Sequence, residues 1–184
     1  MLRCFVPGVL LSSCIPILLL ILMLLQFGPA CAGNQDHINS TQTIRVDITT
    51  HLGDVRNFVE GDKLSFLLSL DRDSHLLVLY QNAKQQIIQL LPNRNRPEYS
   101  LKAGMFISIP EPDAPFVFNI EPPFGQEILW AFASAEGFPE LAGKYRGDGT
   151  KKLSGNMKMI RTKLKASART AFGEVSYKLY TRAR

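Results

Sequence analysis

Through the body of the chain, apolar and polar side chains alternate in short runs with the period of two that is typical of half-buried β-strands. The run over residues 43–50 is the clearest, because Ile44, Val46 and Ile48 fall on one face and charged residues fall on the other. Residues 75–80 are apolar on both faces, as expected for a central strand that is covered on each side. The same patterns predict further strands over residues 63–70, 86–91, 105–109, 116–120 and 128–133.

Turn-forming residues separate these runs. The Asp71-Arg72-Asp73-Ser74 stretch supplies one turn, and five prolines lie between residues 110 and 123. Proline cannot donate a hydrogen bond to a sheet, so these prolines mark the ends of strands. Short strands joined by brief turns, without alternating helices, predict a mainly β fold: an antiparallel β-sandwich or a partly open barrel.

One late segment changes period. Apolar residues recur there at steps of four, three, four and four, which places them on one stripe of a helix. The members of this stripe are Leu153, Met157, Ile160, Leu164 and Ala168. With Thr150 as the N-cap, the pattern predicts an amphipathic helix over about residues 151–169, packed on the sandwich. Alternation resumes afterwards and predicts a final strand over about residues 172–180.

The first 32 residues are typical of a secretory signal peptide: Arg3 precedes a long apolar run, and Ala30-Cys31-Ala32 offers a cleavage motif before Gly33. Two alternatives remain. Cys31 is the lipidated residue if the segment is a lipoprotein signal, and the apolar run is also long enough for an uncleaved membrane anchor. All three place the body outside the cytoplasm, in the periplasm or secreted. Residues 33–42 are then a flexible linker, and residues 43–184 form a single β-rich domain.

Composition narrows the class of protein. The chain has 184 residues, of which 46% are hydrophobic and 20% charged, and this excludes a disordered tail, a collagen-like fibre and a multi-span membrane protein. The three cysteines all lie within the first 31 residues, so the body holds no disulfide framework and no cysteine-based zinc site. No metal site and no cofactor are predicted.

Charge is strongly segregated. Residues 144–184 hold twelve Lys and Arg against two acidic residues, a net charge of +10, whereas residues 33–140 have a net charge of −6. On the predicted helix, a basic stripe lies opposite the apolar one, formed by Lys158, Arg161, Lys165 and Arg169. This stripe is either a solvated helix face or a contact surface for an anionic partner, such as lipid headgroups, cell-wall polymer or an acidic protein. The export signal argues against nucleic acid.

The strongest short signature is the Pro122-Pro123-Phe124-Gly125-Gln126-Glu127 loop. It either closes the end of the sandwich, with Phe124 as a plug, or forms the lip of a binding groove with Glu127 and the nearby Trp130. No nucleophile motif or metal motif accompanies it, so no catalytic residue is predicted. Glu121 and Glu127 are the pair of acids that a polysaccharide hydrolase would use.

Three stretches carry a family resemblance: LLVLYQNAKQQIIQLLPN at residues 76–93, LKAGMFISIP at 101–110 and PPFGQEILWAFAS at 122–134. In this order they resemble a bacterial family catalogued as domain of unknown function 4384, over about residues 45–135. The resemblance implies an extracytoplasmic β-domain, often found on lipoproteins or fused to other modules. The family has no agreed catalytic residues, so no functional residue is carried over.

Together these features predict an exported, non-enzymatic envelope protein that acts as an interaction module. The partner is an envelope protein or an anionic envelope surface, and the membrane is reached only through an N-terminal anchor or lipid. An envelope hydrolase that acts on polysaccharide is one alternative. A structural subunit of an envelope assembly is the other, and it would show an exposed apolar patch or an unprotected edge strand.

Overall fold

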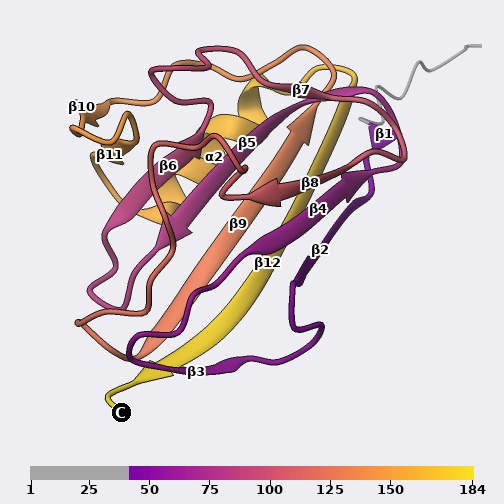
Figure 1. Ribbon diagram of the computed structural model, residues 1–184. Helices are drawn as coiled ribbons and strands as arrows, with labels where there is room; N and C mark the ends of the chain where they lie inside the picture. Colours follow the sequence, from indigo (N-terminus) through magenta and orange to yellow (C-terminus); the bar gives the residue numbers. More distant parts are fainter. Residues whose placement is uncertain (1–41) are drawn as a thin grey trace, which may run out of the picture. The chain divides into compact units, whose positions relative to one another are not determined.

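The computed structural model describes residues 42–184, and all of them fall within one compact unit (Figure 1). A nine-stranded sheet is ordered β1-β12-β9-β5-β6-β11-β10, with β3 on β12 and β7 on β5, and a three-stranded sheet is ordered β2-β4-β8. The strands are β1 (Gln42–Thr43), β2 (Val46–Thr50), β3 (Asn57–Val59), β4 (Phe66–Leu70), β5 (Ser74–Gln81), β6 (Ile87–Leu91), β7 (Ser100–Leu101), β8 (Phe106–Ile109), β9 (Gln126–Ser134), β10 (Gly143–Tyr145), β11 (Lys151–Leu153) and β12 (Ala171–Arg182). The helix is α2 (Met157–Ser167).

The predicted mainly β fold is confirmed, as a sandwich rather than a barrel. Pairing in the described residues is antiparallel, as predicted, except where the short strands β1 and β3 run parallel to β12. The predicted signal peptide, Cys31 and residues 33–41 of the predicted linker lie outside the described residues. Gln42, the last residue of that linker, is the first residue of β1.

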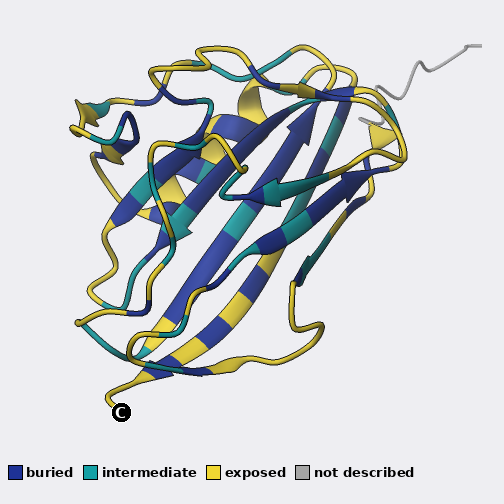
Figure 2. Ribbon diagram, in the orientation of Figure 1, coloured by how far each residue is buried: buried dark blue, intermediate teal, exposed yellow. Residues whose placement is uncertain are grey.

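Two cores lie on opposite faces of the large sheet. One fills the space between the two sheets and contains Leu76 and Val78 of β5, and the other lies under α2 and contains Leu77 and Leu79. Figure 2 shows β5 and β9 as almost continuously buried and β12 as alternately buried and exposed. The prediction that residues 75–80 form a central strand covered on both faces is therefore confirmed.

The helix begins later than predicted. Residues Lys151–Leu153 form strand β11, and α2 starts at Met157, where the Asn156 side chain accepts a hydrogen bond from the Met159 amide at 3.0 Å. Gly155, with a φ of +91°, separates the two elements in a backbone conformation that glycine adopts readily. The prediction was wrong here because Leu153 fits the helical stripe although it is buried as part of a strand.

Residues 116–120 were predicted as a strand and form none. The segment makes one isolated bridge, between Lys63 and Asn119, and the Phe118 carbonyl accepts a hydrogen bond from the Leu64 amide at 2.9 Å. The alternation itself is correct, since Phe116 and Phe118 pack on the core while Val117 is 74% exposed. Pro115 and Pro122-Pro123 bound the segment and keep it too short to extend a sheet.

Candidate functional site

The positive charge of the predicted basic stripe is partly neutralised by a carboxylate on the neighbouring strand β12. Lys165 Nζ lies 3.0 Å from the Glu174 carboxylate on β12, and the Arg161 guanidinium pairs with the same carboxylate. Arg161 also lies over the ring of Trp130, 5.0 Å from its centroid. Lys158 is exposed on α2, whereas Arg169, predicted on the same helix, lies beyond its end at Ser167 and is exposed there. Neither takes part in the ion pairs formed among residues 42–184. Arg161 and Lys165 therefore fix the helix to the sheet.

The structure divides the predicted contact residues between two faces of the large sheet. Trp130 lies on the helix side, where it stacks against Phe132 at 6.3 Å, and its indole donates to Gln81 at 3.3 Å. Phe124 and Glu127 lie on the other side, toward the core between the sheets. Trp130 belongs with Arg161 and Lys165, and Glu127 belongs to a separate site.

Glu127 lines a cavity of 250 Å³, which we call the Glu127 cavity. Residues of β5, β6 and β9 and of the segment 116–123 line it, and the turn between β10 and β11 contributes Arg146, Asp148 and Thr150. The apolar part of its wall includes Ile88, Leu90, Phe116 and Phe118. Glu121 and Asn119 are exposed, and both line the cavity. The predicted loop at Pro122–Glu127 thus does border a cavity.

The Tyr80 hydroxyl donates a hydrogen bond of 2.6 Å to the Glu127 carboxylate. Glu127 is only 3% exposed. The Thr181 hydroxyl makes a longer contact of 3.5 Å to the other carboxylate oxygen. Burial raises the pKa of Glu127 above its usual value, although both hydrogen bonds act in the opposite direction. Burial and the bond to Glu127 raise the pKa of Tyr80 well above that of a free tyrosine.

The other charged groups at this cavity neutralise one another. Arg146 lies 3.6 Å from Asp148, and Asp148 also accepts hydrogen bonds from the Thr150 amide at 3.0 Å and hydroxyl at 2.6 Å. Glu127 and Glu121 take part in none of the ion pairs formed among residues 42–184. The cavity therefore carries an excess of negative charge.

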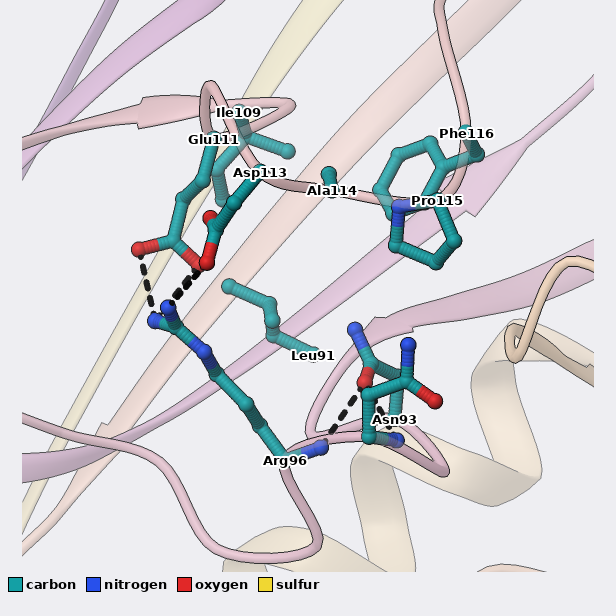
Figure 3. A pocket seen from close by; sticks show the side chains of 10 residues that line it. Leu91, Asn93, Arg96, Ile109, Glu111, Asp113, Ala114, Pro115 and Phe116 are labelled. Carbon is teal, nitrogen blue, oxygen red and sulfur yellow. Dashed lines mark hydrogen bonds and ion pairs between the residues drawn. The ribbon is translucent and has the colours of Figure 1, made fainter.

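A second cavity, of 190 Å³, shares the side chain of Phe116 with the first; we call it the Arg96 cavity. In Figure 3 the Arg96 guanidinium points toward Glu111 and Asp113. It pairs with each carboxylate at an N–O distance of 2.9 Å. The Tyr99 hydroxyl donates a further bond to Glu111 at 2.9 Å. Sequence patterns predicted neither the cluster of Arg96, Glu111 and Asp113 nor the hydrogen bond from Tyr80 to Glu127. In both cases the interacting residues come from separate strands and loops.

Among residues 42–184, no three His, Cys, Asp or Glu side chains cluster in a way that would hold a metal ion. In the same range, the helix is neither long nor apolar enough to cross a bilayer.

Residues 57–137 match the family model described as "Domain of unknown function (DUF4384)", and this segment belongs to that family. The resemblance predicted from the sequence is confirmed, with a start twelve residues later and an end two residues later than the predicted bounds of 45 and 135. The match spans β3 to the end of β9 and includes Tyr80, Glu127 and the segment 110–123, but neither α2 nor β12. No curated protein and no solved structure matches the chain.

Proposed function

We propose that this protein is an exported, non-enzymatic interaction module of the cell envelope, and that it meets a protein partner along segment 105–123. The observation that carries this proposal is the presence of exposed apolar side chains beside two cavities on one segment. Val117 is 74% exposed and lines the Glu127 cavity, and Phe116 lines both cavities. Exposed apolar surface next to a concave site is typical of protein-interaction surfaces.

The start of the same segment supports the proposal. Met105 and Phe106 are 57% and 72% exposed, and Phe106 opens β8, the edge strand of the three-stranded sheet. An edge strand presents unpaired backbone groups to a partner. The same features are those expected of a structural subunit in an envelope assembly, which is an interaction module with a permanent partner.

Placement outside the cytoplasm is proposed from the sequence alone, from the signal pattern of residues 1–32. The basic surface of α2 and the residues just after it is a weaker contact surface than the predicted stripe suggests, because Arg161 and Lys165 already pair with Glu174 and Arg169 lies beyond the helix. An anionic envelope surface would have to be met by Lys158 and Arg169. This is why we favour a protein partner on the opposite side of the large sheet.

The proposal is tested by crosslinking the protein to native envelope material with matched variants. Val117→Asp places a charge on the proposed surface, and Met159→Asp does the same on α2, where Met159 is also an exposed apolar residue. We expect one crosslinked partner with the wild type and with Met159→Asp, and loss of that partner with Val117→Asp. Equal crosslinking by all three proteins would contradict the proposed surface. Charge reversal at Lys158 and Arg169 tests the anionic surface in the same assay.

A polysaccharide hydrolase remains the second candidate, because a buried carboxyl group with a raised pKa inside a cavity is the feature that a general acid needs. Glu121, also at this cavity, would be the second acid. Release of reducing ends from envelope polysaccharide by the wild type, but not by Glu127→Gln, would favour this function over the interaction module.

A further inference from the structure

Among the buried or half-buried carboxylates of the described residues, Glu127 and Asp62 take part in no ion pair; Asp62 is only half-buried and accepts a hydrogen bond from the Val59 amide at 2.9 Å, whereas Glu127 is fully buried. Glu111 is paired with Arg96, Asp148 with Arg146, and Glu174 with Arg161 and Lys165. Glu127 is more deeply buried than any of them. Among the described residues, its carboxylate accepts side-chain hydrogen bonds only from the hydroxyls of Tyr80 and Thr181. A buried carboxylate without a counterion is costly to stability, so a cation that pairs with it would be bound favourably.

The cavity beside Glu127 has the size of one side chain. Its volume of 250 Å³ lies below the range of about 300–1,000 Å³ that is usual for sites of drug-sized ligands. It is large enough for a short alkyl chain that ends in a charged group. A whole sugar chain or a peptide backbone would have to remain outside, over the exposed Val117.

The walls favour a positive group over a negative or neutral one. Two carboxylates without cations, Glu121 and Glu127, offer hydrogen-bond acceptors, while the guanidinium of Arg146 is held by Asp148. Tyr80 and Phe118 pack edge to face, with centroids 4.8 Å apart, and both line the cavity. Carboxylates next to aromatic rings are the combination that recognises ammonium and guanidinium groups.

We infer that the Glu127 cavity binds an organic cation, an ammonium or guanidinium group on a chain no longer than a lysine or arginine side chain. The cation would pair with the Glu127 carboxylate beside the rings of Tyr80 and Phe118, and Glu121 at the cavity would add to the attraction. This inference deepens the proposed function, since a basic side chain of the partner is the expected source of the cation.

The test compares two probes of the same shape that differ in charge. Propylguanidinium and propylurea are titrated into the full-length protein, and backbone amide shifts of residues that line the cavity report binding. We expect the guanidinium to bind about tenfold more tightly, which corresponds to about 1.4 kcal/mol. Equal binding of the two probes to the wild type would overturn the inference.

Two variants locate the effect. Glu127→Gln should reduce the preference for the guanidinium to less than about twofold, while Glu60→Gln, which changes an exposed glutamate away from the cavity, should leave it intact. If Glu127→Gln perturbs the fold, Glu121→Gln, at an exposed position of the same cavity, serves in its place and should also reduce the preference for the guanidinium. A preference that survives Glu127→Gln in a folded protein would contradict the inference.

A third probe distinguishes the source of the cation. A blocked Gly-Arg-Gly peptide should bind more tightly than propylguanidinium if a protein side chain is recognised, and no more tightly if a free small cation is. The outcome is separable from the crosslinking test. A lost charge preference with an intact Val117-dependent partner would overturn this inference alone, and the reverse pattern would overturn the proposed protein partner alone.

Discussion

The two cavities on segment 110–123 differ in whether their most buried carboxylate is paired with a cation. In the Arg96 cavity, Glu111 receives two bonds from the Arg96 guanidinium and one from the Tyr99 hydroxyl, and the guanidinium reaches Asp113 as well. In the Glu127 cavity, a more deeply buried carboxylate has hydroxyl donors but no cation. The first arrangement ties a loop to the sandwich. The second leaves charge uncompensated and is better explained by binding than by stability.

The largest effect is expected at the wall of the Glu127 cavity. Phe118 packs against Phe66, Tyr80 and Phe116, with ring centroids 5.7, 4.8 and 6.3 Å away. Because Phe118 is only partly buried, Phe118→Ala should lower the free energy of unfolding by about 3 kcal/mol, the low end for such truncations. Urea denaturation measures this loss, and a change below about 1 kcal/mol would show that the aromatic cluster does not support the cavity.

The two tyrosines give the next comparison. Tyr80→Phe removes the principal donor of a carboxylate without a cation, whereas Tyr99→Phe removes one of several partners of Glu111. At neutral pH we expect losses of about 2 kcal/mol for Tyr80→Phe and about 1 kcal/mol for Tyr99→Phe. Equal losses in urea denaturation would remove the distinction between the two cavities.

The ionisation of Glu127 should make stability depend on pH. Because burial raises its pKa in the folded protein, the folded state binds the proton more tightly than the unfolded state, and stability falls as pH rises from about 4.5 through the raised value. The charged or titratable groups that line the same cavity are Tyr80, Glu121, Arg146 and Asp148. Glu127→Gln should therefore raise stability by about 1 kcal/mol at pH 7 and have little effect at pH 4. Thermal unfolding at both pH values measures this difference, and a destabilised variant at pH 7 would contradict it.

The smallest effect is expected for Arg96→Gln. The Arg96 side chain is 43% exposed, so solvent and salt screen its ion pairs with Glu111 and Asp113. The variant should lower the melting temperature slightly at low ionic strength and not measurably at high ionic strength. A large loss that does not depend on salt would show that the Arg96 cavity depends on more than these exposed pairs.

Much of the fold could be predicted because its signals are local. Alternation correctly grouped Ile44, Val46 and Ile48 on one face, which packs on the core, and identified β5 as a central strand. It failed for β11, since three residues are too few to separate a period of two from a helical stripe. It also failed for residues 116–120, because whether an extended segment finds a neighbouring strand depends on the rest of the molecule.

The site was partly predictable. Glu127 was a predicted contact residue and lines a cavity, but grouping it with Trp130 was inconsistent with alternation, since residues three apart on one strand face opposite sides. Its partner Tyr80 lies 47 positions away and is brought close by the register that pairs Tyr80 with Leu129. No sequence pattern contains that register. The pairing of Glu174 with Arg161 and Lys165 depends in the same way on how α2 packs against β12.

The most direct test of this account is the titration of the Glu127 side-chain carboxyl, followed by carbon NMR in the full-length protein with and without propylguanidinium chloride. A midpoint above the usual value of 4.5 that falls when the cation is added is the predicted result, because burial disfavours the charge and the ligand restores its partner. A midpoint at or below 4.5 that the cation does not move would contradict the account.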